Sequence, residues 1–388
     1  MKKKIIISLF LTLLFSAMYS QNEVITGAER MEEYLKELKN KKVALLTNQT
    51  GVVRNSEGKL VHLLDTLLSH KIDIVKVFSP EHGFRGNVEA GGVVKNSIDS
   101  KTGLPIISLY GKNKKPTKEQ MQDFQILLFD LQDVGCRFYT YISTLHYVME
   151  ACAENNCKLI VLDRPNPNDY IDGPVLEPKF KSFVGMHTVP VLHAMTIGEY
   201  AQMINGEGWL KDSIKCDLQV IKLLNWHHNM EKAYQLLVSP SPNLQTPKAI
   251  ALYPSLCFFE GTKISVGRGT QTPFEIIGSP EYPDTTFSFT PIAIKGVSDN
   301  PPYKNTKCYG MKDLQEKNKE LDLFFLKKMY KSIEKKENFF TLFFDKLAGT
   351  DKLRKQIENG MSEEEIKKTW QKDIEKFKKI RLKYLLYK

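Results

Sequence analysis

The first half of the chain alternates short, continuously apolar runs with stretches of helical periodicity. Runs that are apolar at nearly every position are typical of strands buried on both faces of a parallel sheet. Because crossovers between parallel strands are right-handed, the pattern predicts an α/β fold with a Rossmann-like, doubly wound, mostly parallel sheet. The predicted strands cover 43–47, 72–78, 126–131, 159–162 and a less apolar segment, 105–109, and helices are expected over 58–68, 118–123 and 144–155.

The pattern changes after about residue 215, where mixed strand and loop segments with proline clusters replace the regular alternation. We therefore expect a Rossmann-like catalytic domain over 21–215 and a smaller α+β domain over 216–388 that completes a cleft. A closing helix is marked by Ser362 and Glu365, which form a capping-box pair, and the segment that follows it is expected to dock the tail.

Residues 1–20 have the layout of a secretory signal peptide, with three lysines, an apolar run and then small and polar residues. The run is shorter than the roughly 20 residues that a membrane span needs. We expect a periplasmic or secreted protein with no stable membrane insertion after cleavage, and the rival interpretation is an uncleaved N-terminal anchor.

Composition and missing motifs exclude several classes of function. The formal net charge is +10, but the C-terminal lysines alternate with glutamates, which favours a solvated helical face over a nucleic-acid surface. The six cysteines lack metal or redox spacing, and the first predicted strand is not followed by Gly-x-Gly-x-x-Gly. A dinucleotide cofactor is therefore not expected. Ester or amide hydrolysis is disfavoured because there is no Gly-x-Ser-x-Gly elbow.

Polar residues follow four of the predicted strands, and the carboxyl ends of parallel strands share one edge of a sheet, where ligands bind. Turn formation explains some of these residues equally well. The candidates for substrate contact among them are Asn48, Asp163 and Arg164.

Glu81 is the main candidate for catalysis, because it is no favoured turn residue and stands where a buried strand breaks. Partial desolvation of a carboxyl group there suits a general acid. Its neighbour His82 has three open interpretations: it orients Glu81, contacts substrate, or is a half-buried structural histidine.

Asp133, Arg137 and Tyr139 lie just past the third polar strand end. Asp133 is a candidate catalytic carboxylate, and an ion pair with Arg137 would fix the loop. Tyr139 either stacks on a sugar or packs beneath the loop.

Further candidates come from outside the predicted sheet. Glu199 follows Thr196 by three positions, so capping and catalysis are both open for it. Glu260 precedes a Gly-Arg-Gly segment in which Arg268 is suited to a carboxylate or phosphate, although an ordinary glycine turn also fits. Carboxylates from two domains that face one cleft would suit glycosidic cleavage.

Taken together, these motifs resemble the NamZ-like exo-β-N-acetylmuramidase family over nearly the whole chain that follows the signal segment. The resemblance is carried by Ser-Pro-Glu-His-Gly-Phe-Arg-Gly at 79–86, Asp-Leu-Gln-Asp-Val-Gly at 130–135 with Arg137, Tyr139, Thr140 and Tyr141, Leu-Asp-Arg-Pro-Asn-Pro at 162–167, Asp-Gly-Pro at 172–174, Met-Thr-Ile-Gly-Glu at 195–199, Ser-Pro-Asn-Leu at 241–244, Glu-Gly-Thr at 260–262, Gly-Arg-Gly-Thr at 267–270, Gly-Thr-Asp at 349–351 and the helix over 370–387.

The resemblance implies a glycoside hydrolase that releases N-acetylmuramic acid from non-reducing ends of peptidoglycan fragments, with Glu81 catalytic and without metal or organic cofactor. It adds Asn243 to the substrate-contact candidates. We further hypothesise that Arg268, Arg85 or Arg137 binds the lactyl carboxylate of the sugar. Two alternatives are a non-catalytic glycan-binding protein and an exported esterase that acts on an acidic sugar.

Overall fold

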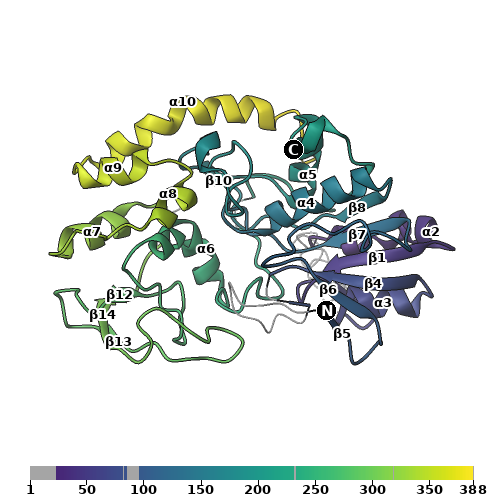
Figure 1. Ribbon diagram of the computed structural model, residues 1–388, viewed down its shortest axis with the longest axis horizontal. Coiled ribbons are helices and arrows are strands. Elements are labelled where there is room, and N and C mark those ends of the chain that lie inside the picture. Colours follow the sequence, from purple (N-terminus) through teal and green to yellow (C-terminus); the bar gives the residue numbers. More distant parts are fainter. Residues whose placement is uncertain (1–22, 82, 85–95, 231–232, 318, 388) are drawn as a thin grey trace, which may run out of the picture.

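The computed structural model describes residues 23–81, 83–84, 96–230, 233–317 and 319–387. Its large sheet has the order β11-β8-β7-β1-β4-β6-β5, and every pairing in it is parallel except that of β5 with β6 (Figure 1). Its strands are β1 (Lys42–Thr47), β4 (Asp73–Ser79), β5 (Ser97–Ile98), β6 (Pro105–Ser108), β7 (Ile126–Asp130), β8 (Lys158–Leu162) and β11 (Leu218–Ile221).

The strand order confirms the predicted doubly wound α/β fold. The chain runs outward from β1 through β4 to β6, then returns to the other side of β1 and runs outward again through β7, β8 and β11. The order of strands therefore reverses between β1 and β7, and a crevice for ligands opens at the carboxyl ends of the strands at such a point.

Apolar side chains cover both faces of the sheet, which is why its strands read as continuous apolar runs. In β1, Val43 and Leu45 belong to one buried cluster, whereas Ala44 and Leu46 belong to the other. All five predicted strands are present with ends that differ by no more than a residue or two.

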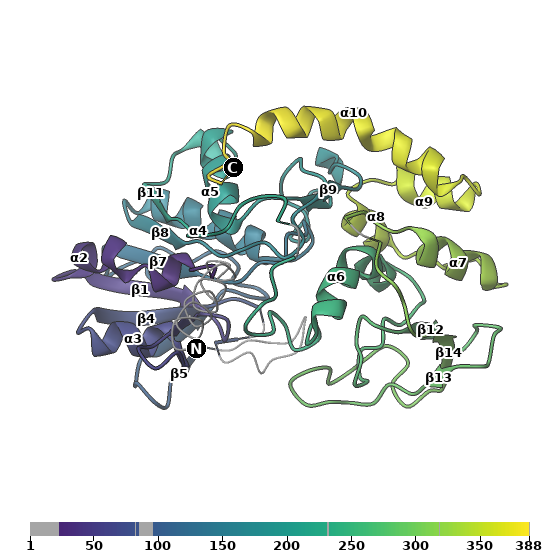
Figure 2. The same cartoon turned by 180° about the vertical axis from the view of Figure 1, so that it is seen from behind.

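Two short helices pack on one face of the sheet, and two longer helices pack on the other. The first cluster includes side chains of α2 (Leu35–Leu38) and α3 (Leu63–Ser69). The second includes side chains of α4 (Tyr141–Glu154) and α5 (Ile197–Gly206), on the opposite side of the sheet from α3, and it extends without a break into the C-terminal part of the molecule (Figures 1 and 2).

Two of the predicted helices are wrong in detail. The segment 58–68 begins with β3 (Leu60–His62), which pairs with β2 (Val52–Arg54), and only the following residues form α3. Residues 118–123 form a single turn rather than a helix. Asp123 has a positive φ of 71°, which ends the turn just before β7.

The C-terminal part combines helices with a small antiparallel sheet of order β12-β14-β13. Short 3-10 helices occur at Gly27–Glu29, Met31–Glu33, Pro178–Phe180, Lys211–Ser213 and Cys257–Gly261. The other elements are β9 (Ile171–Asp172), β10 (Leu192–His193), α6 (Pro247–Leu256), β12 (Ile277–Ser279), β13 (Ser288–Phe289), β14 (Cys308–Met311), α7 (Phe324–Ser332), α8 (Leu342–Ala348), α9 (Lys352–Glu358) and α10 (Glu363–Arg381).

Helix α10 runs from the C-terminal part across the middle of the molecule and returns the chain toward the large sheet (Figure 1). Its predicted capping box is present, since Ser362 and Glu365 bond each other's backbone amides. The guanidinium of Arg381 donates to the carbonyl of Ala194, and the Tyr387 hydroxyl donates to Asp163 at 2.5 Å. The tail therefore docks on the first unit, as expected.

The large sheet extends beyond residue 215, where we placed the domain boundary, because β11 is its edge strand. The predicted signal segment 1–20 lies outside the described residues. Within the described ranges, no helix is both long and apolar enough to cross a membrane.

Candidate active site

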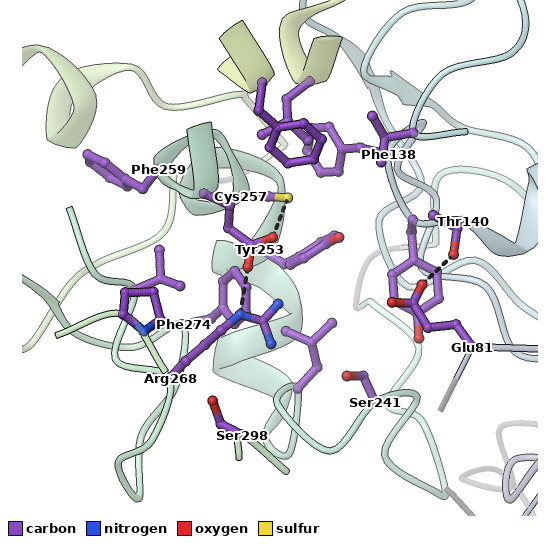
Figure 3. A pocket seen from close by; sticks show the side chains of 18 of the residues that line it. Glu81, Phe138, Thr140, Ser241, Tyr253, Cys257, Phe259, Arg268, Phe274 and Ser298 are labelled. Carbon is purple, nitrogen blue, oxygen red and sulfur yellow. Dashed lines mark hydrogen bonds and ion pairs between the residues drawn. The ribbon is translucent and has the colours of Figure 1, made fainter. Parts of the chain in front are cut away.

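A cavity of about 700 Å³ lies between the carboxyl edge of the large sheet and the C-terminal part. This volume falls within the usual range for small-molecule sites. From the first unit it is lined by Glu81, Tyr110, Phe138, Tyr139, Thr140, Tyr141, Phe183 and Val184. The facing residues include Ser241, Tyr253, Cys257, Glu260, Lys263, Arg268, Phe274 and Ser298 (Figure 3).

Glu81 reaches the cavity because it follows β4 at the carboxyl edge of the sheet. The Thr140 hydroxyl donates a hydrogen bond of 2.7 Å to Oε2 of Glu81. Thr140 immediately precedes α4, so this carboxyl group lies beside the positive end of a 14-residue helix. The adjacent candidates His82 and Arg85 fall outside the described residues.

Tyr139 belongs to a hydrogen-bonded wall of the cavity, and Asn48 supports this wall from behind. Tyr139 donates to the carbonyl of Pro240 at 2.8 Å, and its ring meets Tyr141 edge-on. Asn48, at the end of β1, donates to the Tyr141 hydroxyl at 2.6 Å from behind the lining. Burial raises the pKa values of both tyrosines, so both remain protonated donors. Asn48 thus positions a lining residue rather than lining the cavity itself.

Asp133 is buried behind this wall and is not part of the lining. Its Oδ1 accepts from the backbone amide of Gly135 at 2.7 Å, whereas Oδ2 has no hydrogen-bond partner among the described residues. Burial raises the pKa of Asp133 to about 7.

The ion pair expected between Asp133 and Arg137 is absent from the described part of the chain, so that prediction is wrong. Arg137 is fully buried, and its two terminal nitrogens donate to four carbonyls, those of Pro174, Val189, Leu347 and Ala348. Burial lowers its pKa to about 9. The guanidinium therefore joins the two units and does not line the cavity.

Asp163 and Arg164 are likewise buried and lie away from the cavity. Asp163 accepts hydrogen bonds from Thr196, Gly198 and Tyr387, and Arg164 is paired with Asp130 at 2.6 Å. These contacts fix the start of α5, the C-terminal tail and the turn after β8.

Glu199 forms the capping box of α5 with Thr196 and does not line the cavity. It is fully buried, and its Oε2 accepts from the backbone amide of Thr196 at 3.0 Å. Its Oε1 is bonded to His228 at 3.0 Å and accepts from the amide of Leu386. This placement favours the structural alternative for Glu199.

Glu260 and Arg268 face each other on the C-terminal wall. Nε of Arg268 donates to Oε1 of Glu260 at 2.6 Å, and the guanidinium lies over the ring of Phe274 at 5.1 Å from its centroid (Figure 3). Asn243 lies behind the same wall, where its amide nitrogen donates to the carbonyl of Val297. Of the carboxylates in the described ranges, Glu81 and Glu260 line this cavity.

Sequence reasoning missed several residues of the site. Thr140 was part of a recognised motif, but only its place before a helix that faces Glu81 makes it a partner of that carboxyl group. Phe274, Lys263 and Tyr253 come from loops and a helix without any periodic signal that would mark a ligand. Their contribution depends on contacts across the two units.

The fold and this cavity define a two-unit α/β protein with an acid-bearing site at the carboxyl edge of its sheet. Comparison with known proteins gives the family. Residues 43–248 match the family model described as exo-beta-N-acetylmuramidase NamZ, N-terminal, and residues 251–387 match its C-terminal counterpart.

Individual relatives agree with these matches. The chain is 40% identical to peptidoglycan beta-N-acetylmuramidase NamZ of Bacillus subtilis over 94% of this chain and 92% of the relative. Two crystal structures of DUF1343 family proteins from Bacteroides fragilis are also similar. The first is 46% identical with a TM-score of 0.86, and the match covers 95% of this chain and 99% of that protein. The second is 30% identical with a TM-score of 0.77, and the match covers 94% of this chain and 99% of that protein. The chain belongs to the exo-beta-N-acetylmuramidase NamZ family.

Proposed function

We propose that this protein is an exo-acting glycoside hydrolase that releases N-acetylmuramic acid from the non-reducing ends of peptidoglycan fragments. In this proposal Glu81 is the general acid. The observation that carries it is the place of Glu81 in the cavity between the two units, with its carboxyl group held by Thr140. Membership of the family supports the substrate and the type of bond.

The proposed reaction breaks the bond between C1 of the terminal sugar and the glycosidic oxygen. Glu81 gives its proton to that oxygen as the bond breaks, so the departing sugar leaves as a neutral alcohol. A water molecule supplies the hydroxyl group at C1, and its second proton restores the acid. The Thr140 hydroxyl fixes one oxygen of Glu81 and so orients the carboxyl group toward the substrate.

The aromatic residues of the lining suit a sugar ring. Tyr139, Tyr141 and Tyr253 pack edge-on against one another or against further rings, which holds each in one orientation. Such rigid, partly polar surfaces bury the apolar face of a sugar at low entropic cost.

The test uses two substrates, a chromogenic β-glycoside of N-acetylmuramic acid and the natural disaccharide with N-acetylglucosamine as the departing sugar. The wild type should release the sugar from both. Glu81→Gln should lower kcat on the disaccharide by about 10²–10⁴-fold with unchanged thermal stability. Equal kcat values for wild type and variant would contradict the proposal.

Two alternatives give different outcomes in the same assay. A non-catalytic glycan-binding protein would bind the disaccharide, measured by calorimetry, without releasing either sugar. An esterase would leave both glycosides intact and cleave an ester of an acidic sugar.

We also propose that the protein acts outside the cytoplasm, on the strength of the basic and apolar residues at 1–20. N-terminal sequencing of protein recovered from bacterial culture fractions tests this. The expected result is an extracytoplasmic protein that begins near residue 21, and an intact N-terminus in the cytoplasmic fraction would contradict it.

A further inference from the structure

The backbone around Arg268 is held in a tight turn. The flanking residues Gly267 and Gly269 have positive φ angles of 76° and 79°. A Cβ atom at Gly267 would lie 2.5 Å from a side-chain carbon of Ile276, and one at Gly269 would lie 2.5 Å from the carbonyl oxygen of Ile292. Only glycine fits both positions, so the Gly-Arg-Gly turn fixes where the arginine side chain starts.

The side chain of Arg268 is fixed from two directions. Glu260 accepts from its Nε at 2.6 Å, and Phe274 supports the guanidinium face. Phe274 itself has a φ of 62°, which is a strained conformation for a bulky residue. Strain of this kind persists where the surrounding structure enforces it and is concentrated at functional sites. Here it places the ring beneath the guanidinium.

These contacts leave the far end of the guanidinium available. The side chain is 16% exposed, and no described residue accepts a hydrogen bond from its two terminal nitrogens. An arginine held at Nε presents its terminal nitrogens as a fork, which matches the two oxygens of a carboxylate. Figure 3 shows the guanidinium on the side of the pocket that faces Glu81.

The charge of this wall also favours an anion. Glu260 balances one positive charge, but Lys263 lines the same wall and has no carboxylate within 4 Å among the described residues. Arg268 and Lys263 together therefore leave the wall with an excess of one positive charge. The other arginine hypothesis that the structure addresses, Arg137, is excluded because its terminal nitrogens donate to carbonyls in a buried position.

We propose that Arg268, held by Glu260 and Phe274, binds a carboxylate on the terminal sugar of the substrate and thereby selects that sugar. This inference rests on the proposed function, under which the carboxylate is the lactyl group of N-acetylmuramic acid. Glu260 is then a positioning residue, because it acts on the substrate through Arg268.

The experiment compares two chromogenic β-glycosides that differ in one group, the free lactyl carboxylate and its uncharged carboxamide. Neither probe carries a peptide, so any preference belongs to the sugar's own carboxylate. The wild type should favour the carboxylate by about 10- to 100-fold in kcat/KM, as expected for hydrogen bonds to a charged group. Arg268→Gln should cleave both probes at similar rates, close to the wild-type rate on the carboxamide.

Arg354→Gln is the matched control, since Arg354 is also paired with a carboxylate, Asp345, but lies on α9 outside the cavity lining. It should keep the full preference. A wild type that cleaves both probes equally, or an Arg268→Gln variant that retains the preference, would overturn the inference while leaving the proposed hydrolase intact. Failure of the wild type to cleave either probe would instead reject the proposed function.

A second measurement needs no variant. Free N-acetylmuramic acid should inhibit the wild type about 10-fold or more strongly than its carboxamide, and raising the salt concentration should weaken only the inhibition by the acid. Equal inhibition by the two sugars would contradict the inference even if Arg268→Gln failed to fold.

Discussion

The hydroxyl of Thr140 donates to Oε2 of Glu81 at 2.7 Å, and this contact joins the end of β4 to the start of α4. The residues are 59 positions apart in the chain, and the strand order of the sheet brings them together. Thr140 occupies the N-cap position of α4 without a side-chain capping bond, and its hydroxyl instead holds the carboxyl group that faces the cavity.

Thr140→Val removes the hydroxyl with little change in volume. We expect kcat on the disaccharide to fall about 10-fold with KM nearly unchanged, because the substrate still binds while the acid is less well oriented. Thr140→Ser restores the hydroxyl and should recover most of the loss. A Val variant with wild-type kcat, or a Ser variant no better than Val, would show that the contact does not position Glu81.

Arg137 is predicted to stabilise the fold rather than to bind substrate. Arg137→Met removes hydrogen bonds to four buried carbonyls, two of which belong to the last two residues of α8. Leaving these carbonyls without partners should lower the free energy of unfolding, measured by urea denaturation, by about 3–5 kcal/mol. Arg354→Met on the surface should cost less than about 1 kcal/mol. A loss at Arg137 no larger than at Arg354 would contradict the structural role.

Asp133 should make stability depend on pH. Burial raises its pKa to about 7 from the usual 3.8 of an aspartate, so the folded state binds a proton that the unfolded state has released between those values. Its carboxyl group therefore destabilises the folded state progressively as pH rises from about 4 to 7. The stability that Asp133→Asn gains relative to wild type should be about 4 kcal/mol larger at pH 8 than at pH 4.

The comparison for this prediction is Asp373→Asn on an exposed position of α10. As a surface substitution it should change the free energy of unfolding by no more than about 0.5 kcal/mol at either pH. If the stability difference between Asp133→Asn and wild type were the same at pH 4 and pH 8, the raised pKa of Asp133 would be refuted.

His228 should give the opposite dependence at higher pH. Burial alone would lower its pKa, but hydrogen bonds to Asp169 and Glu199 outweigh it and raise the value to about 9. The stabilisation from the protonated ring is then complete below about 6.5 and is lost as pH rises through 9. The free energy of unfolding of wild type should decline by about 2–3 kcal/mol over this pH interval, and that of His228→Gln should not. Curves of unfolding free energy against pH that run parallel for the two proteins would argue against the raised pKa.

The sheet could be predicted from the sequence because its strands are buried on both faces. The runs that contain Leu45, Leu128 and Ile160 are apolar without interruption, a pattern typical of central parallel strands. The short hairpin of β2 and β3 was missed because its burial is mixed and because its last residue, His62, is already the N-cap of α3. Local pattern alone does not distinguish such a hairpin from the first turn of a helix.

The site could be predicted only in part. Glu81 and Arg268 reach the cavity, as their positions after a strand and within a glycine turn indicated. Arg137 looked equally suited to a ligand, yet its carbonyl partners lie as many as 211 residues away. Whether a polar residue faces a cavity or closes an interface depends on such distant contacts, which a single sequence does not contain.

The role of Glu81 as the acid is tested most directly by changing how much the leaving group needs a proton. Glu81→Gln and wild type are compared on the natural disaccharide and on a 4-nitrophenyl β-glycoside of the same sugar, whose leaving group departs readily as an anion. We predict that the variant loses about 10²–10⁴-fold in kcat on the disaccharide and about 10-fold or less on the nitrophenyl glycoside. Equal losses on the two substrates would contradict the assignment of Glu81 as the proton donor.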